Sequence, residues 1–200
     1  MSLAVIYIHG FNSSPLSVKA QQLQTYFDQH KLIERQGYQL HIPALDWRPK
    51  IAVEQLVTII ERQLIDTDKP NILLIGSSLG GYYSLWLAQK YPQCSAVLIN
   101  PAVYPYVLLQ ALLGENQNIY TGHRYRLTAE HIEQLKALEV AQLRDPQRIL
   151  LLSQSADETL DYREAVDKLQ GVEQRVTAGG SHSYENFDTQ LAAIFAFVGA

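Results

Sequence analysis

Residues 71–86 read NILLIGSSLGGYYSLW, an apolar run that breaks into serine and glycine and then resumes as an aromatic segment with helical spacing. Serine and glycine bury little surface and weaken both strands and helices, so their place after the most apolar strand needs a reason. Residues 76–80 fit the pattern G-x-S-x-G, which is typical of a serine nucleophile on a strand-to-helix turn. The pattern alone arises by chance in about one of fifteen chains of this length, so its context must decide.

The two serines of this turn can be told apart by their neighbours. A nucleophile raised above a sheet edge sits on a strained turn, commonly with a positive φ. Side chains two residues before and after it would collide around such a turn, which favours glycine at both positions. Ser78 has glycine at both offsets, whereas Ile75 and Leu79 flank Ser77. The sequence therefore predicts Ser78 as the nucleophile, with the N-terminus of the following helix aimed at it.

Elsewhere in the chain, short apolar runs alternate with segments of helical period. We expect strands at 3–8, 37–45, 71–76, 94–100, 147–154 and, more weakly, 173–179. Strands that are apolar throughout and joined by helices are typical of a parallel sheet covered on both faces. The predicted fold is therefore α/β and doubly wound, a mostly parallel six-stranded sheet in one domain over residues 1–200.

Helix starts and apolar stripes place the helices between these strands. Ser14 as N-cap and Pro15 at the first helical position predict one helix start. Its apolar stripe would be Leu16, Ala20, Leu23 and Phe27, and the next helix would bury Val53, Leu56, Ile60 and Leu64. A further helix should end before Pro92, and the last should bury Phe187, Leu191, Ile194, Phe195 and Val198. Residues 102–127, rich in tyrosine, leucine and asparagine, predict a short cap, followed by a helix over about 129–138.

A serine hydroxyl needs a base, and six histidines are available. His30, His41 and His131 fall on predicted helix or strand surfaces, and His123 lies in the cap, where a surface loop is favoured over substrate contact. His182 follows the last strand in a glycine-rich loop. Loops at the carboxyl ends of parallel strands converge in space, so His182 should meet Ser78 there.

An acid that orients the imidazole should follow the fifth strand, where Asp157, Glu158 and Asp161 occur. Asp161, with Glu164 three residues later, has a structural explanation as the start of a capping box. Glu158 stays open as a second choice, and Asp157 is preferred because it lies a few residues past the strand. The chain order Ser78, Asp157, His182 is the order of an α/β-hydrolase triad.

The oxyanion of an acyl-transfer intermediate needs donors, which a second loop usually supplies. Gly10 follows the first strand and permits a close backbone approach, so we predict the Phe11 and Leu79 amides as the oxyanion hole. We also expect Gly10 and Asn12 of this loop, and Tyr104 and Tyr106 of the cap, to contact substrate. For the cap tyrosines, core packing is an equally good interpretation.

Composition limits the classes of partner. Of the 200 residues, 47% are hydrophobic and 18% charged, and the net charge of −4 argues against nucleic acid or an anionic membrane. Cys94, the single cysteine, excludes an intrachain disulfide and a thiolate metal cage, and is expected to fill a buried strand. Tyr91–Gly114 is uncharged, but its prolines argue against a membrane span. The N-terminus shows no signal peptide pattern, so a cytoplasmic location is expected.

The segments YIHGFNSSP, IGSSLGGYY, INPAV, DETLDYREAV and GGSH resemble those of the α/β-hydrolase superfamily, and more closely its small YqiA-type esterases. They run from about residue 6 to 182. The resemblance implies a compact hydrolase whose sheet lacks the first two strands of the full superfamily fold. It also implies carboxylester hydrolysis with Ser78, Asp157 and His182 as the triad.

The predicted function is a serine esterase that needs no cofactor or metal and acts on a small-molecule ester. An acyl-CoA thioesterase or acyltransferase would need the same apparatus and stays the main alternative. A non-catalytic binding protein on this fold is a third hypothesis, although no triad member is missing. The substrate, the acyl length and a homodimer all stay open.

Overall fold

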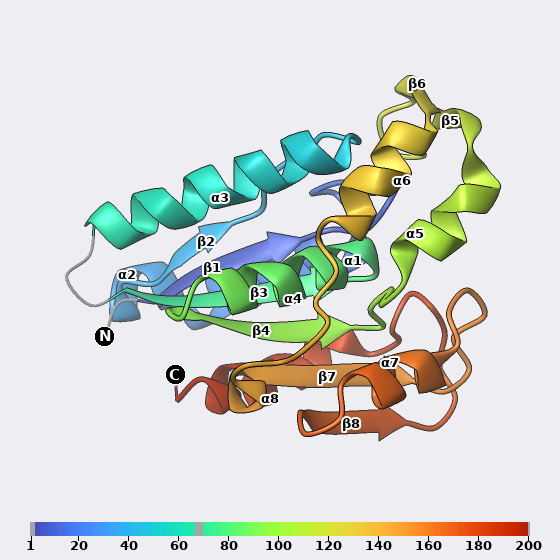
Figure 1. Cartoon of the computed structure of the whole chain (residues 1–200). Helices are drawn as coiled ribbons and strands as arrows, with labels where there is room; N and C mark the ends of the chain where they lie inside the picture. Colours follow the sequence, from blue (N-terminus) through green and yellow to red (C-terminus); the bar gives the residue numbers. More distant parts are fainter. Residues whose placement is uncertain (1–2, 67–69, 200) are drawn as a thin grey trace.

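The computed structural model describes residues 3–66 and 70–199, and a six-stranded parallel sheet lies at its centre (Figure 1). The strand order is β2-β1-β3-β4-β7-β8, and every neighbouring pair is parallel. The strands are β1 (Leu3–Ile8), β2 (Gln39–His41), β3 (Asn71–Ser77), β4 (Cys94–Ile99), β7 (Ile149–Gln154) and β8 (Glu173–Thr177). All six predicted strands are confirmed, although β2 is shorter than its sequence run.

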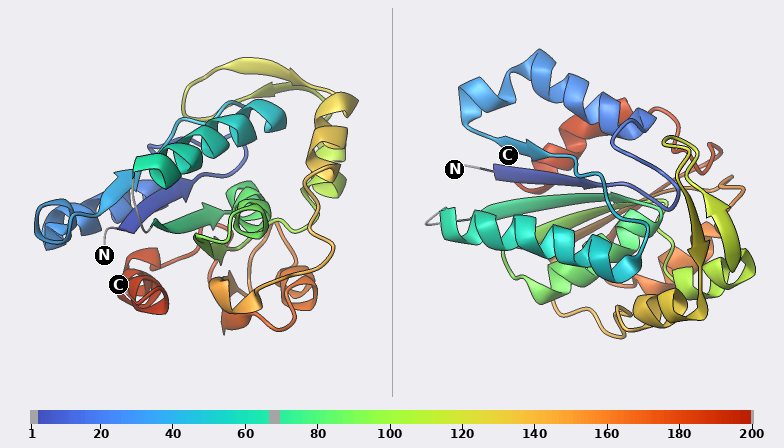
Figure 2. Two further views of the ribbon diagram at one scale, coloured as in Figure 1. Left: turned by 60° about the vertical axis from the view of Figure 1, so that its left-hand side comes forward. Right: turned by 90° about the horizontal axis from the view of Figure 1, so that it is seen from above.

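Helices cover both faces of the sheet, as the apolar strands predicted (Figure 2). Val5 and Tyr7 of β1 pack with helices α1 (Val18–His30) and α8 (Leu191–Phe197). The alternate residues, Ile6 and Ile8, pack with α3 (Pro49–Asp66) and α4 (Leu79–Lys90) on the other face. The central strands β1, β3, β4 and β7 are buried on two sides, which explains their continuous apolar sequences. The edge strands β2 and β8 are partly exposed and carry more polar residues.

The start of α1 differs from the sequence prediction. The helix begins at Val18 with Ser17 as N-cap, three residues later than expected. Ser14 instead closes a turn, because its carbonyl accepts from Ser17 N at 3.1 Å and its hydroxyl accepts from Leu16 N at 3.0 Å. Leu16 is consequently 68% exposed, and its predicted place in the core is wrong.

The other predicted helices occur close to their expected positions. α3 buries Val53, Leu56 and Ile60, and Leu64 is partly buried against the same core. Asp161 is the N-cap of α7 (Tyr162–Lys168), where its carboxylate accepts from Arg163 N at 3.0 Å. The remaining elements outside the segment predicted as a cap are α2 (Leu32–Gln36), α6 (Ala129–Lys136), η2 (Pro146–Arg148) and η3 (Phe187–Gln190).

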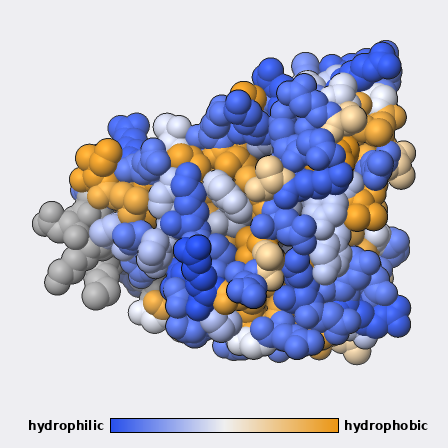
Figure 3. Space-filling view, in the orientation of Figure 1, coloured by the Kyte–Doolittle hydropathy of each residue, from blue (hydrophilic) through white to orange (hydrophobic). Residues whose placement is uncertain are grey.

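The segment predicted as a cap contains α5 (Pro105–Leu108), η1 (Leu109–Leu112) and an antiparallel hairpin of β5 (Gly114–Gln117) with β6 (Arg124–Leu127). These elements stand beyond the carboxyl ends of β3 and β4 (Figure 1). Hydrophobic surface lies over the α5 and η1 segment in Figure 3. Its exposed apolar residues are Val107, Leu108, Leu112 and Leu113.

The topology brings two loops together at one sheet edge. The chain runs from β1 outward to β2, then returns to place β3 on the other side of β1. The loops that follow β1 and β3 therefore lie side by side at the point where the strand order reverses, which is where open α/β sheets bind ligands.

Two further expectations concern the core and the membrane. Cys94 is fully buried at the start of β4, and burial raises the pKa of its thiol to about 12, as suits an apolar filler. Within residues 3–66 and 70–199, no helix has both the length and the apolar composition that crossing a bilayer requires.

Candidate active site

Ser78 lies on a strained turn between β3 and α4. Its backbone has φ +55° and ψ −119°, the positive φ that its predicted role requires. Its amide donates to Ile99 O of β4 at 3.0 Å, and its carbonyl accepts from Gly81 N and Ala102 N at 2.9 and 3.2 Å. Hydrogen bonds from three segments thus hold the backbone in a conformation that a serine would not adopt by itself.

The two glycines around Ser78 are required by close backbone contacts. A Cβ on Gly76 would collide with the carbonyl oxygen of Gly80 and with Ser84 Oγ. A Cβ on Gly80 would collide with the carbonyl oxygen of Ile8, the last residue of β1. The predicted steric reason for G-x-S-x-G is therefore confirmed, and the neighbouring strand supplies half of it.

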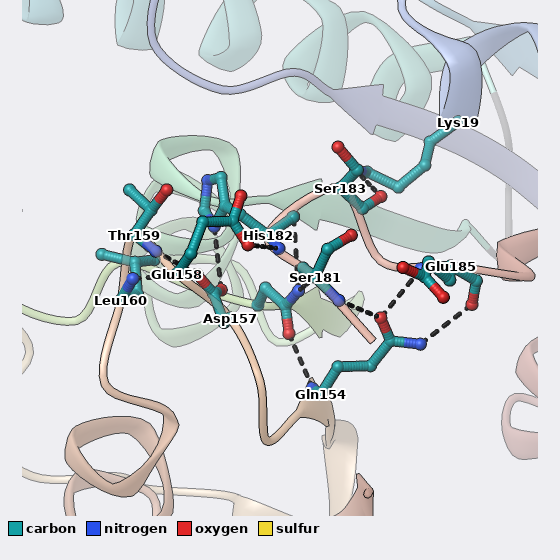
Figure 4. Close-up of polar contacts among 11 residues, drawn as sticks. Lys19, Gln154, Asp157, Glu158, Thr159, Leu160, Ser181, His182, Ser183 and Glu185 are labelled. Atoms are coloured by element: carbon teal, nitrogen blue, oxygen red, sulfur yellow. Dashed lines mark hydrogen bonds and ion pairs between the residues drawn. The ribbon is translucent and has the colours of Figure 1, made fainter. Parts of the chain in front are cut away.

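His182 and Asp157 form a hydrogen-bonded pair at the carboxyl ends of β7 and β8 (Figure 4). The His182 Nδ1 atom lies 2.8 Å from Asp157 Oδ2. The other carboxylate oxygen, Oδ1, accepts from the amides of Thr159 and Leu160 at 2.9 and 2.8 Å. The Asp157 side chain is 2% exposed, whereas that of His182 is 25% exposed. The two backbone amides thus hold the Asp157 carboxylate in place, and the His182 imidazole stays accessible to solvent.

The electrostatics of this pair set the tautomer of His182. Burial raises the pKa of Asp157, but the hydrogen bonds from His182, Leu160 and Thr159 outweigh it and hold that pKa below its usual range. An ionised carboxylate only accepts hydrogen bonds, so Nδ1 of His182 carries the proton. The lone pair on Nε2 is then free to accept a proton.

The two other acids near this loop have different partners. Glu158 Oε2 accepts from the backbone amide of His182 at 2.9 Å, so Glu158 supports the loop rather than the ring. Asp161 caps α7 and forms an ion pair with Arg163 at 2.8 Å. Of the three acids considered from the sequence, the structure brings only Asp157 to the imidazole.

Ser78 and His182 line one cavity of about 340 Å³, together with Gly10, Phe11 and Asn12. This volume suits a small ligand. Among the described residues no hydrogen bond joins Ser78 Oγ to the His182 ring. The catalytic roles of the three predicted residues stay predictions at this point.

The loop after β1 approaches Ser78 closely. A Cβ on Gly10 would lie 3.1 Å from Ser78 Cβ, so a larger residue would press on the turn. His9 is buried, with Nε2 accepting from Leu45 N at 3.2 Å and Nδ1 at 3.0 Å from Gly10 O. Burial lowers the pKa of His9, in keeping with a neutral ring that fixes the loop.

The Phe11 and Leu79 amides are the predicted oxyanion donors. In the described part of the chain neither amide donates a hydrogen bond, so both are available to a ligand. Leu79 is the first residue of α4, where the helix leaves its amides without internal partners. Their role also stays a prediction, supported by the position of Leu79 next to Ser78 in the chain and by the close approach of Gly10, which precedes Phe11, to the Ser78 side chain.

The β5–β6 hairpin docks onto the loop that contains Phe11. The Tyr125 hydroxyl donates to Asn12 Oδ1 at 2.5 Å, and Asn118 Nδ2 donates to Ser13 O at 2.9 Å. The rings of Phe11 and Tyr125 meet edge to face at 6.2 Å. Asn12 lines the cavity as expected, but Tyr125 already occupies its side-chain oxygen. The hairpin thus supports the predicted oxyanion loop.

The structure does not bring Tyr104 and Tyr106 to this cavity. They contact each other edge to face at 6.2 Å, and Lys168 Nζ lies over the Tyr104 ring. Both pack against the core under the cap, which is the second interpretation that the sequence left open. Ile119 and Tyr120, from the tip of the hairpin, line the cavity instead.

The other histidines lie outside the cavity. His131 is buried rather than on a helix surface, because its Nδ1 accepts from Thr128 N at 3.0 Å to complete the capping box of α6. His123 is exposed on the hairpin and stacks on Tyr125. Within the described ranges, no group of three or more histidine, cysteine or acidic side chains could hold a metal ion.

Two buried side chains that the sequence analysis did not select hold the His182 loop. Asn100, at the end of β4, donates from Nδ2 to Ser181 O at 2.9 Å and to His182 O at 3.3 Å, while its Oδ1 accepts from Gln154 N. The Gln154 carboxamide binds the amides of Ser181 and Glu185 at 3.1 and 2.8 Å (Figure 4). The motif INPAV, which contains Asn100, was the available sequence signal, and the structure adds the positive φ of Asn100, +39°.

Replacing Asn100 by glycine is expected to lower catalytic turnover about tenfold to a hundredfold, because small displacements of a catalytic group carry costs of that size. Glycine accepts the positive φ, so the effect reports the lost hydrogen bonds. Those unpaired groups should also lower the free energy of unfolding by about 2 kcal/mol. Ester kinetics and thermal unfolding measure both quantities. Asn116→Ala is the matched control, since its two donated bonds stay within the cap; an equal loss there would contradict the assignment.

Comparison with known proteins identifies a family. The model of the uncharacterised protein family UPF0227 matches residues 4–199, almost the whole chain. The match agrees with the family-level resemblance drawn from the motifs, which is thereby confirmed.

Solved structures confirm the fold. Est1E from Butyrivibrio proteoclasticus, bound to ferulic acid, has a TM-score of 0.69 at 14% identity, covering 98% of this chain and 88% of that one. Mouse alpha/beta hydrolase domain-containing protein 10 has a TM-score of 0.65 at 18% identity, with coverages of 96% and 87%. The monoacylglycerol lipase of Paleococcus ferrophilus has a TM-score of 0.64 at 16% identity, with coverages of 98% and 94%. At these identities the likeness shows the fold alone, which is the predicted α/β-hydrolase fold.

Proposed function

We propose that this chain, which belongs to the UPF0227 family, is a serine esterase that hydrolyses small carboxylic esters through an acyl-enzyme intermediate. The observation that carries the proposal is that His182, hydrogen-bonded to Asp157, lines the same cavity as Ser78 on its strained turn. The lipase and the ferulate-bound Est1E among the fold neighbours are in keeping with ester chemistry.

Each step of the proposed reaction uses a group with the required protonation. Nε2 of His182 takes the proton of Ser78 as Oγ attacks the ester carbonyl carbon. The Phe11 and Leu79 amides donate to the resulting oxyanion. His182 then gives its proton to the leaving alcohol. A water molecule, deprotonated by the same Nε2, then attacks the acyl carbon of the acyl-enzyme. The bond from that carbon to Ser78 Oγ breaks, Nε2 returns the proton to Oγ, and the acid leaves.

Labelling with a fluorophosphonate tests the proposal directly, because such a reagent phosphonylates only an activated serine. We expect one label, on Ser78, in the folded wild type and none after heat denaturation. Mass spectrometry of the labelled peptide identifies the residue. The Ser77→Ala variant should keep the label and Ser78→Ala should lose it. If native protein stays unlabelled while its fold is intact, a binding protein would be the better interpretation.

The thioesterase alternative shares every group of this site and differs only in the leaving group. Oxygen esters and acyl-CoA thioesters of the same acyl chain separate the two activities. A small cavity beside Ser78 favours the oxygen ester, so its kcat/KM should be the larger. A higher kcat/KM for the thioester across acyl lengths would replace the esterase assignment.

A further inference from the structure

Lys19 is a cation inside the cavity that holds Ser78 and His182. It extends from the first turn of α1, and its ammonium group donates to the Ser183 carbonyl at 2.7 Å, one residue past His182 (Figure 4). The side chain is partly buried. Within residues 3–66 and 70–199, no carboxylate lies within 4.0 Å of this ammonium group. The Lys19 ammonium group therefore has no direct acidic partner among the described residues.

Burying part of an ammonium group with no carboxylate beside it costs free energy, unless a ligand supplies a compensating negative charge. Burial lowers the pKa of Lys19 to about 8, while the charge of Asp157 acts in the opposite direction. The group is thus protonated at neutral pH. The described part of the chain uses one of the group's three donors, through Ser183, which leaves two for a ligand. Glu185, which also lines the cavity, is exposed, and water screens its charge.

Nearby groups favour an anion at the same place. The first turn of α1 contains no acidic residue, and its N-cap Ser17 makes no side-chain capping bond. Ser17 and Val18 line the cavity beside Lys19, so the positive end of the helix dipole adds to the ammonium charge. The side-chain amide of Gln22, one turn along α1, lines the same wall and can donate to a ligand as well.

We propose that Lys19 is a specificity-determining residue that binds a carboxylate of the substrate, so that the preferred substrates are esters with a carboxylate in their acyl or alcohol half. This inference rests on the proposed esterase function. Lys19 is the one lysine or arginine among the described residues that line the cavity of the reacting serine, and one such charge matches a monoanion close to the ester bond. Phosphates at the far end of a long cofactor arm, such as that of coenzyme A, would lie outside so small a cavity.

The test compares each carboxylate with its isosteric neutral amide. Umbelliferyl esters of adipic acid and of its monoamide place the charge in the acyl half. O-butyryl glycolate and O-butyryl glycolamide place it in the alcohol half. The wild type should prefer the carboxylate in one of these pairs by about tenfold to a hundredfold in kcat/KM, the range of one charged hydrogen bond. No preference in either pair would overturn the proposal.

Variants of Lys19 separate binding of a substrate carboxylate from support of the His182 loop. Lys19→Met should abolish the preference for the carboxylate, and Lys19→Arg should restore most of it. Lys50→Met is the matched control, since Lys50 is exposed on α3. If Lys19→Met lowers kcat/KM equally for carboxylate and amide, Lys19 only holds the His182 loop through Ser183, and the proposal is wrong.

The pH dependence gives an independent readout. As pH rises through about 8, Lys19 loses its proton, so kcat/KM for the carboxylate should fall relative to that for the amide. The ratio cancels changes that affect both substrates. The titratable groups around Lys19 are Tyr7, Tyr120, Asp157, His182, Tyr184 and Glu185. A ratio that stays constant across this range would contradict the role of Lys19.

A binding measurement keeps this inference distinct from the esterase proposal. Calorimetry of adipamic acid and of neutral adipamide needs no turnover. If no ester is hydrolysed but adipamic acid binds the wild type and not Lys19→Met, the carboxylate site stands and the esterase function fails. If esters are hydrolysed and adipamic acid binds both proteins equally, the carboxylate site fails and the esterase function stands.

Discussion

Replacing Ser78 by alanine is expected to lower kcat for a small ester by about a million-fold, the loss measured when the nucleophile of a comparable triad is removed. The loss should appear in kcat because the hydroxyl forms a bond only along the reaction path. The cavity keeps its shape, since alanine lacks only Oγ, and KM should change little. Steady-state kinetics with an activated ester measures the effect, and thermal unfolding shows whether the fold is kept.

The neighbouring Ser77 provides the control for this prediction. It is the last residue of β3, is 5% exposed and also lines the cavity. Of these two serines, only Ser78 has the positive φ that raises its side chain above the sheet edge. Ser77→Ala should therefore stay within about tenfold of the wild-type kcat, far above Ser78→Ala. Equal activity of Ser78→Ala and wild type would remove the basis of the mechanism.

The sequence predicted those features that depend on local sterics or on period. The collisions that require glycine at positions 76 and 80 follow from the geometry of one turn, and the structure contains them. The four central strands, β1, β3, β4 and β7, followed from continuous apolar runs, since their residues are buried on both faces of the sheet. The edge strands β2 and β8 are more polar and partly exposed, and β8 was the weaker prediction. The predicted start of α1 was wrong because a serine–proline pair occurs in turns as well as at helix N-termini. Only the hydrogen bonds of Ser14 decide between the two.

Neither the β5–β6 hairpin nor the long-range polar contacts could be predicted from the sequence. The hairpin was missed because β5 reads GENQ, which has no apolar alternation, although β6 reads RYRL and does alternate. Asn100 and Gln154 bind backbone groups of a loop that lies about thirty to eighty positions further on. Lys19 reaches a carbonyl 164 positions away. No hydrophobic period predicts such contacts, and the motif INPAV marks Asn100 without identifying its partners, so the contacts appear only when the fold is assembled.

Replacing Asp157 by asparagine should lower kcat by about ten-thousand-fold, as for the corresponding change in a known triad. The two carboxylate oxygens have different partners, which fixes how asparagine will sit. Its oxygen should keep the place of Oδ1, where the amides of Thr159 and Leu160 donate. Its NH₂ group must then face Nδ1 of His182. A donor at that place forces the proton onto Nε2, which can no longer accept the proton of Ser78.

Glu158→Gln is the matched variant for this prediction, because it removes an adjacent carboxylate charge and keeps a carbonyl oxygen for the His182 amide. Since Glu158 is exposed and binds only the backbone, its loss should change kcat by no more than about tenfold. Steady-state kinetics of the two variants at one pH gives the comparison. The reverse order, with Glu158→Gln severely impaired and Asp157→Asn active, would assign the orienting acid to Glu158. The 2.8 Å contact of Asp157 with the imidazole and the burial of its carboxylate favour the order predicted here.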